Sequence, residues 1–532
     1  MRINHGQYHT SIHLALALGG LTASGCIENV LQNTDGNQVD SGQDSLSGWT
    51  AGATDVTETG GGESGFATDT NFAMTGGSTS SGETGAVSTG ETGPSSTDTG
   101  GDTIMDGDTS TGGDTSTGGD TGTGETGEPP VPGEGVAVSV VTATDLTCVL
   151  LDTDQVRCWG YGPWGQHGLG NTGTFGDDDT PDALPNVQVG FDVKQLVAGD
   201  HFVCALSRVG GRVRCWGRGT HGVLGTGSLT TIGDDEHPAD APEVKLNWPA
   251  VELAAGGTHV CALGIDGEVG CWGQALEGQL GYGNKKNIGD DEVPAMAGSV
   301  PVGGPVAHIF AGGSTTCAIM KTGQSRCWGR GGTHGNGTEA IGDNETPGSV
   351  KVLALPWPVE EFASGGSFTC ARAGAAHGGE VRCFGDPALY PNGFGQGHLG
   401  SGNLDPVWTA EQAPLVELEW PAVEISAYTW HTCARSGLGR VKCWGTGGWG
   451  RLGYGNQQNV GDDETPADVG DVLLGFDADQ VSAGAYHTCT LYKGGKLRCW
   501  GWNGQGALGL GALGLIGDDE EPFFGWDTPY QP

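Results

Sequence analysis

Cysteine supplies the clearest chemical pattern in this 532-residue sequence, which contains 15 cysteines. Fourteen form seven pairs, in which the second member precedes Trp-Gly or Phe-Gly and the first lies ten, eleven or thirteen residues upstream. The pairs are Cys148 and Cys158, Cys204 and Cys215, Cys261 and Cys271, Cys317 and Cys327, Cys370 and Cys383, Cys433 and Cys443, and Cys489 and Cys499. Paired cysteines form disulfides in oxidising compartments or coordinate zinc.

The residues between the cysteines favour disulfides. In the pair Cys261 and Cys271, Asp266-Gly267 fits a type I turn followed by a left-handed glycine, which gives a hairpin with a three-residue loop. The two cysteines then face each other at a Cβ separation of about 4.5–5.5 Å, close to what a disulfide needs. Zinc, the competing interpretation, favours pairs with about two to four intervening residues and a second ligand pair.

Acidic loops form the second pattern whose residues could bind a ligand. Six of the seven repeats carry one after the hairpin, as in Gly289-Asp-Asp-Glu292. Calcium prefers clustered carboxylate and carbonyl oxygens, although the spacing matches no EF-hand loop. The candidate calcium ligands are Asp234, Asp235, Glu236, Asp290, Asp291, Glu292, Asp462, Asp463 and Glu464. The favoured alternative is purely structural, with aspartates accepting backbone N–H bonds in tight turns and no cofactor bound.

Recurrent aromatic and histidine positions indicate packing rather than catalysis. The tryptophan of each Cys-Trp-Gly motif is predicted to lie in the core between neighbouring repeats. His259, His431 and His487 stand two residues before a cysteine, where other repeats have Leu146 or Phe202. A position that accepts leucine is not a shared catalytic base, so these histidines are predicted to be buried. The sequence also has no Gly-x-Ser-x-Gly elbow, His-Glu-x-x-His pair or P-loop.

The fifth repeat breaks the pattern. It has Phe384 in place of tryptophan, a longer hairpin and no acidic loop. Irregularity in a regular array can mark a binding site, so Tyr390, Phe394 and Trp408 are candidate binding residues. Sequence drift without functional consequence is the alternative.

The elements that hold these residues are short strands repeated about every 57 residues. The Cys-(Trp/Phe)-Gly motifs are spaced by 57, 56, 56, 56, 60 and 56 residues. Such a repeat predicts an all-β array, and a ring of seven needs no atypical capping repeats, which favours a seven-bladed β-propeller over a solenoid. The first repeat has no acidic loop before it and the last ends with one. Residues 136–141 and the C-terminal segment are therefore predicted to share a blade.

The motifs Ala-Gly-x-x-His-Thr/Val-Cys-Ala-Leu, Trp-Gly and Gly-Gln-Leu-Gly-x-Gly resemble the regulator of chromosome condensation repeat, which builds a seven-bladed propeller. The resemblance covers all seven repeats, residues 136–532. Cysteines in both hairpin strands and the acidic loops depart from the founding member and resemble bacterial exported versions. The founder is a nuclear exchange factor for a small GTPase and binds chromatin. None of its catalytic residues is carried over.

Two further segments precede the repeats. Residues 1–26 resemble a lipoprotein-type signal peptide, with Arg2, a short apolar stretch and Ala23-Ser24-Gly25-Cys26. Cys26, the one unpaired cysteine, is the predicted lipidation site, and a plain signal peptide is the alternative. Residues 27–135 are Gly-, Ser- and Thr-rich with 19 acids and no Lys or Arg, which predicts a disordered acidic linker.

Charge narrows the function. With 64 acidic and 23 basic residues the net charge is −41, which argues against nucleic acid and against any membrane contact other than an N-terminal lipid. The sequence predicts a monomeric outer-membrane lipoprotein, or another cell-surface protein, of a Gram-negative-type bacterium, or else a secreted protein. Its predicted role is binding a protein or glycan. An exported polysaccharide- or wall-acting enzyme is the alternative, and guanine-nucleotide exchange by family analogy is a weaker one.

Overall fold

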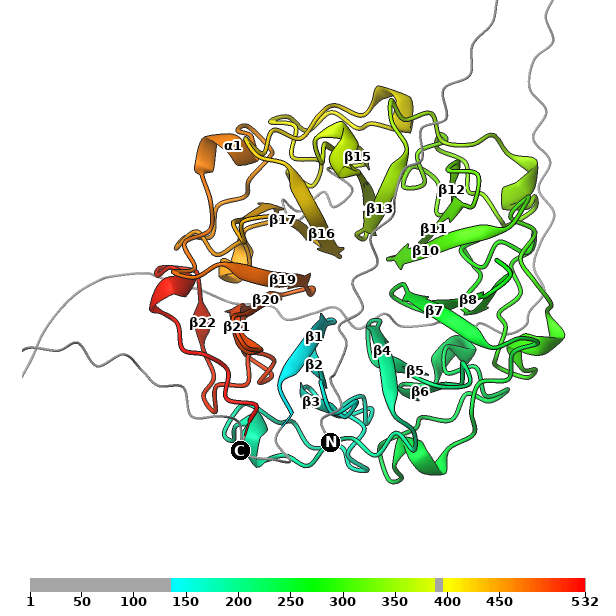
Figure 1. Ribbon diagram of the computed structural model, residues 1–532, viewed down its shortest axis with the longest axis horizontal. Helices are drawn as coiled ribbons and strands as arrows, with labels where there is room; N and C mark the ends of the chain where they lie inside the picture. The colour runs from blue at the N-terminus through cyan, green and yellow to red at the C-terminus, as the bar shows by residue number, and fades with distance from the viewer. Residues whose placement is uncertain (1–134, 388–395, 532) are drawn as a thin grey trace, which may run out of the picture. The chain divides into compact units, whose positions relative to one another are not determined.

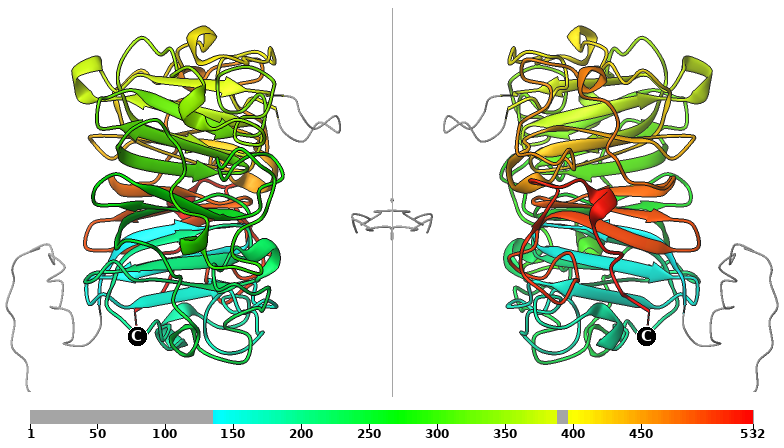
Figure 2. Two further views of the ribbon diagram at one scale, coloured as in Figure 1. Left: turned by 90° about the vertical axis from the view of Figure 1, so that its right-hand side faces the viewer. Right: turned by 90° about the vertical axis from the view of Figure 1, so that its left-hand side faces the viewer.

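The computed structural model describes residues 135–387 and 396–531. They form seven antiparallel sheets arranged as blades around a central axis (Figure 1), and in side views the strands run across the thickness of the ring (Figure 2). The predicted all-β seven-bladed fold is confirmed. Cys26, the predicted linker, Tyr390 and Phe394 lie outside the described residues. Within those residues, no helix is long and apolar enough to cross a bilayer.

Each blade has three main strands. The first four blades comprise β1 (Ala137–Thr142), β2 (Leu146–Leu151), β3 (Val156–Gly160); β4 (Val193–Ala198), β5 (Phe202–Ser207), β6 (Val213–Gly217); β7 (Ala250–Ala255), β8 (His259–Gly264), β9 (Val269–Gly273); and β10 (Val306–Gly312), β11 (Thr315–Met320), β12 (Ser325–Gly329). The others comprise β13 (Val359–Ser364), β14 (Phe368–Ala373), β15 (Val381–Gly385); β16 (Ala422–Tyr428), β17 (His431–Ser436), β18 (Val441–Gly445); and β19 (Ala478–Ala483), β20 (His487–Tyr492), β21 (Lys496–Trp502), β22 (Leu515–Ile516).

Among the residues that the structure describes, helical structure is confined to single turns in the connections. One of them is an α-helical turn, α1 (Pro466–Val469). The 3-10 turns are Pro181–Ala183, Thr220–Gly222, Pro238–Asp240, Pro294–Met296, Pro347–Ser349, Ala375–His377, Ala410–Gln412, Gly448–Gly450 and Pro522–Phe524. A proline opens many of these turns because its fixed φ suits the first helical position and its missing N–H costs nothing there.

The register of the outer hairpins brings the cysteines together. Cys261 on β8 lies directly opposite Cys271 on β9, and the longer loops in the second and fifth blades keep the same pairing. All seven predicted pairs are joined as disulfides. The cysteines are buried, so each bridge belongs to the core of its own blade.

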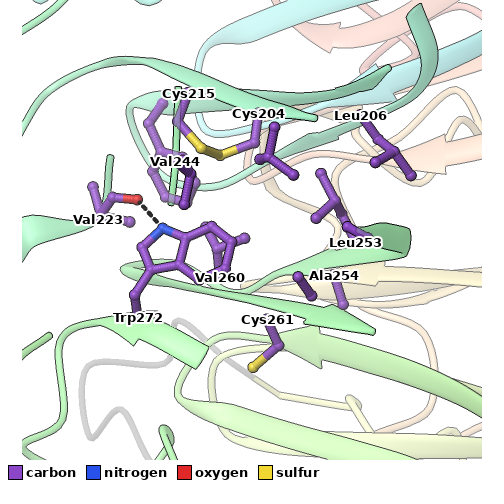
Figure 3. Close-up of a cluster of buried hydrophobic side chains, with 14 of the residues drawn as sticks. Cys204, Leu206, Cys215, Val223, Val244, Leu253, Ala254, Val260, Cys261 and Trp272 are labelled. Atoms are coloured by element: carbon purple, nitrogen blue, oxygen red, sulfur yellow. Dashed lines mark hydrogen bonds between the residues drawn. A yellow bond between two sulfur atoms is a disulfide. The ribbon is translucent and has the colours of Figure 1, made fainter. Parts of the chain in front are cut away.

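The tryptophans of the Cys-Trp-Gly motifs fill the space between blades, as predicted. Trp272 is fully buried, and its indole Nε1 donates to the Val223 carbonyl of the preceding blade at 2.9 Å. Figure 3 shows it among apolar side chains, beside Val244 and Val260. Gly225 makes this approach possible, because a Cβ there would lie 2.9 Å from the same Nε1. At Trp272 the interface between blades is thus an apolar layer fixed by a hydrogen bond.

The recurrent histidines are buried in the same interfaces. His259 is fully buried, and its Nε2 lies 2.7 Å from the Thr316 hydroxyl of the next blade. That hydroxyl donates to the Gln279 carbonyl, so it accepts from the imidazole N–H. Burial lowers the pKa of His259 to about 3, which keeps the ring neutral. The predicted packing role is confirmed.

The acidic loops contact the neighbouring blade. In the third repeat, the Gly289 carbonyl accepts hydrogen bonds from Gly227 N and Ser228 N of the second repeat, at 3.1 and 3.2 Å. The same contact closes the ring, where Gly511 N of the last repeat donates to Gly176 O of the first at 3.2 Å. These loops therefore help to fix each blade against the one before it.

The predicted sharing of one blade by the two ends of the array is wrong. β1 pairs with β2 in the first sheet, and β22 pairs with β21 in the last. The reason is that Ile516 occupies, opposite Gly501, the place that Ile288 takes opposite Gly273 within its own repeat. Every repeat completes its own sheet.

Side-chain hydrogen bonds add to the backbone contacts that close the ring. The amide of Gln480 on β19 exchanges two hydrogen bonds with the backbone of Val140 on β1, at 2.9 and 3.1 Å. Tyr530 adds a third contact near the end of the chain, because its hydroxyl accepts from Ala137 N at 3.0 Å.

Candidate ligand-binding face

Several residues that are not part of the repeated core lie at one end of the ring. In each blade, the loop between the first and second strands is hydrogen-bonded to the residue that follows the third strand, as in Arg218 N to His201 O and Trp502 N to Tyr486 O, both 2.9 Å. These loops therefore lie at the same end of every sheet. We call this end the axial face.

An aromatic cluster of Trp449, Tyr486 and Trp502 occupies the axial face of the sixth and seventh blades. The Tyr486 ring lies edge-on to both tryptophans, with centroid distances of 5.3 Å to Trp449 and 5.4 Å to Trp502. Trp449 is 37% exposed. Its φ of 60° lies in the left-handed region, which is costly for a bulky residue. Strain of this kind concentrates at functional positions.

The buried Arg451 contacts two rings of this cluster. Its guanidinium lies 5.0 Å from the Trp449 ring centre and 5.5 Å from that of Tyr486. It donates to the Gly448 and Ala485 carbonyls at 2.9 and 2.7 Å. Burial lowers the pKa of Arg451 to about 9, so it stays charged at neutral pH. The cation holds the rings rigidly in place.

Two carboxylates lie near the ring axis. Tyr428 of the sixth repeat donates its hydroxyl to Asp200 Oδ1 of the second repeat at 2.9 Å, a contact that spans the ring. Asp145, in the corresponding loop of the first repeat, is largely buried, and this burial raises its pKa to about 7. The centre of the axial face is therefore a compact cluster of acidic and phenolic groups.

A small polar pocket opens between the second and third blades. It has a volume of about 190 Å³ and is lined by Asp200, His201, Phe202, Arg218, Thr220, His221, Val223, Gly257 and Thr258. The Arg218 guanidinium lies 4.6 Å from the ring centre of Trp164 in the first blade. Burial lowers the pKa of His201; nearby Asp200 opposes this shift and Arg218 adds to it. We call this the Arg218 pocket.

The acidic loops bring their carboxylates together but also pack against a neighbour. Ligand atoms of each predicted calcium triad lie within 4.8 Å of one another. Burial, and then the hydrogen bond to Asp291, raise the pKa of Glu292 to about 7. Calcium binding by these residues stays a prediction, as does the structural alternative, which the contacts between blades support.

Trp408 takes the place of the missing acidic loop in the fifth repeat. Its carbonyl accepts from Gly337 N of the fourth repeat at 2.9 Å, and a Cβ on Gly332 would lie 2.7 Å from its ring. The side chain is half-buried. This contact explains how the fifth repeat packs against the fourth without an acidic loop. A binding role for Trp408 stays a prediction.

Sequence reasoning missed the aromatic cluster, Arg451 and Arg218. Comparison of the turns repeat by repeat supplies the signal. Trp164, His221 and Trp449 all stand immediately before the first glycine of a Gly-x-x-Gly turn, outside the Cys-Trp-Gly motif. The residue at this position differs from repeat to repeat, so a large side chain there is not part of the repeated core.

The Asp145 environment predicts a pH effect on stability. Its pKa rises from 3.8 to about 7 on folding, so the folded state binds more protons between these values, and this stabilisation is lost as pH rises through about 7. We expect Asp145→Asn to flatten the profile and to be more stable than the parent at pH 8. Urea unfolding at pH 4.5 to 8 measures this. An equally steep decline in both proteins would contradict the shift.

Comparisons with known proteins agree with the geometry. Models of the regulator of chromosome condensation (RCC1) repeat match residues 193–223 and 478–507, and a second RCC1 repeat model matches 210–263 and 439–491. The Arabidopsis thaliana ultraviolet-B receptor UVR8 is 30% identical over 316 residues, 58% of this chain and 65% of UVR8. The human E3 ubiquitin-protein ligase HERC2 is 26% identical over 60% of this chain but only 6% of its own length.

A solved structure shows the same fold. Yeast RCC1 (Prp20), crystallised bound to Kap60, superposes with a TM-score of 0.53 at 18% identity and covers 74% of this chain and 85% of that one. The chain spans less than two thirds of the curated relatives it matches. The repeat matches and the ring of seven sheets together support an RCC1-type repeat propeller.

Proposed function

We propose that the propeller is a binding module that holds a protein or glycan ligand on its axial face. The observation that carries this proposal is the aromatic cluster, in which Trp449 is partly exposed and has a left-handed backbone conformation. Tryptophan, tyrosine and arginine dominate protein-binding hot spots, and exposed aromatic rings also stack on sugars. The yeast relative has been crystallised with a protein bound.

The proposed setting is outside the cytosol, at a cell surface or secreted. Seven disulfides support this setting because thiols stay reduced in the cytosol. Lipidation at Cys26, and through it attachment to an outer membrane, belongs to the same proposal. A localisation experiment with the full chain tests it, and accumulation in the cytosol with free thiols would reject it.

An exported enzyme is the second candidate, favoured by one observation. Asp145 and Asp200 both lie in axial-face loops, and the Asp145 pKa of about 7 would suit an acid catalyst. Asp200, however, is already bound to the Tyr428 hydroxyl. Hydrolysis assays on a polysaccharide panel separate the candidates, since turnover that Asp145→Asn abolishes would replace the binding proposal.

Replacing Trp449 with alanine should weaken ligand binding by about 2 kcal/mol, or roughly thirtyfold, as expected for a hot-spot tryptophan. The ligand is first identified by pull-down and glycan array with the full chain, and affinities are then measured by calorimetry. Trp526→Ala is the matched control, because Trp526 is 80% exposed in the C-terminal segment, apart from the aromatic cluster. Equal losses in the two variants would contradict a role for the axial face.

A further inference from the structure

Among the described residues, the Arg218 guanidinium forms no ion pair with a carboxylate. Arg208, Arg372 and Arg435 each form an ion pair with a carboxylate. Within residues 135–387 and 396–531, no acceptor takes a hydrogen bond from the Arg218 guanidinium, which instead lies over the Trp164 ring. Arginine is a planar fork suited to binding a carboxylate through two hydrogen bonds. In a chain with a net charge of −41, such an unused fork is notable.

The pocket around Arg218 is sized for one ring. Its volume of about 190 Å³ lies below the roughly 300 Å³ at which pockets for drug-sized ligands begin. Trp164 fixes the guanidinium from one side, so the donors have a defined direction. The pocket can therefore accept one unit of a longer ligand, with the remainder lying across the axial face.

The other lining groups match a polyhydroxylated ring better than an acidic amino-acid side chain. The Asp200 carboxylate accepts hydrogen bonds, while the His201 imidazole and the Thr220 hydroxyl can take part in further ones. An aspartate or glutamate side chain would use the Arg218 fork but offers no hydroxyls to these groups. A sugar ring offers hydroxyls to each of them.

We propose that the Arg218 pocket binds a carboxylate-bearing sugar unit, a uronic acid residue of an acidic glycan. The ring carboxylate lies against the Arg218 fork, and ring hydroxyls hydrogen-bond to Asp200, His201 and Thr220. This inference rests on the proposed binding function and names its ligand class. It also explains how a strongly acidic protein tolerates an acidic ligand, because the contact places the anion at a cation held within the pocket.

Calorimetric titration of the full chain tests this assignment. The probes are oligosaccharides of polygalacturonate, alginate and hyaluronate, each compared with its carboxyl-reduced form, in which CH₂OH replaces the carboxylate. We expect at least one acidic series to bind, with its reduced form weaker by about tenfold or more, the effect of losing a hydrogen bond to a charged group. Binding of no acidic series at millimolar concentration, or equal affinity for both forms, overturns the assignment.

Variants locate the effect. Arg218→Gln should abolish the preference for the acidic form, and Arg218→Lys should retain part of it because the charge remains while the fork is lost. If Arg218→Gln fails to fold, the measurement on Arg218→Lys provides the test. Arg208→Gln, at the other end of the same hairpin, is the matched control and should keep the full preference. An unchanged preference in folded Arg218→Gln overturns the proposal.

Two results separate this inference from the proposed function. If poly-glutamate binds as tightly as the acidic oligosaccharides and with the same dependence on Arg218, the pocket serves an acidic protein and the glycan assignment is wrong. If the acidic probes do not bind but another ligand binds in a manner that Trp449→Ala weakens, the axial face retains its function and only the ligand class fails.

Discussion

Replacing Trp272 with alanine should lower the free energy of unfolding by about 3–5 kcal/mol, the usual cost of truncating a buried large aromatic side chain. The indole is fully buried between the second and third blades. Its removal leaves a cavity against Val244 and deprives the Val223 carbonyl of its N–H donor. Urea or guanidinium unfolding, followed by circular dichroism, measures the change.

Trp272→Phe is the matched control for this truncation. Phe384 occupies the corresponding position of the fifth blade and is fully buried there, so a phenyl ring suits this type of interface. We expect the phenylalanine variant to lose clearly less stability than the alanine variant. Equal losses would show that the hydrogen bond to Val223, rather than packing, dominates the interface.

Removing the Cys261–Cys271 bridge should cost about 2–3 kcal/mol in the chain-entropy model, because the cross-link closes a short loop. The double variant Cys261→Ala/Cys271→Ala is preferred over serine, since both positions are fully buried and a serine hydroxyl would lack a partner. Denaturant unfolding under oxidising conditions gives the difference.

Reduction of the parent protein provides the control for that variant. Reductant should lower the unfolding midpoint of the parent by much more than that of one bridge, because all seven cross-links are lost together. A double variant as stable as the parent would mean that the bridge adds nothing to a hairpin already fixed by its neighbours.

Local signals made the fold predictable from sequence. Asp266-Gly267 determines the hairpin loop, and this loop determines that Cys261 faces Cys271. The recurrent Trp-Gly motif then marks the buried layer in every blade. Ring closure was less predictable, because the hydrogen bonds of Gln480 to Val140 join residues 340 positions apart, and no local pattern encodes such a pair.

The candidate site was largely unpredictable from the sequence, because its residues also lie far apart in the chain. Tyr428 and Asp200 come from repeats separated by 228 positions, and only closure of the ring brings them into contact. Arg218 and Trp164 belong to different repeats, so the absence of an acidic partner becomes visible only once the neighbours are placed. The sequence indicated candidate binding residues in the irregular fifth repeat. The groups assembled on the axial face, however, come mainly from the sixth, seventh, first and second repeats.

The connectivity of the bridges has a consequence for biosynthesis. Each of these seven bridges joins two consecutive cysteines of the chain within one blade, and none of the seven links two blades. Eight cysteines alone allow about 105 pairings, but a chain oxidised in the order in which it emerges encounters the native partner first. We therefore expect oxidative folding of this ring to require an electron acceptor for thiols and to need little help from a disulfide isomerase.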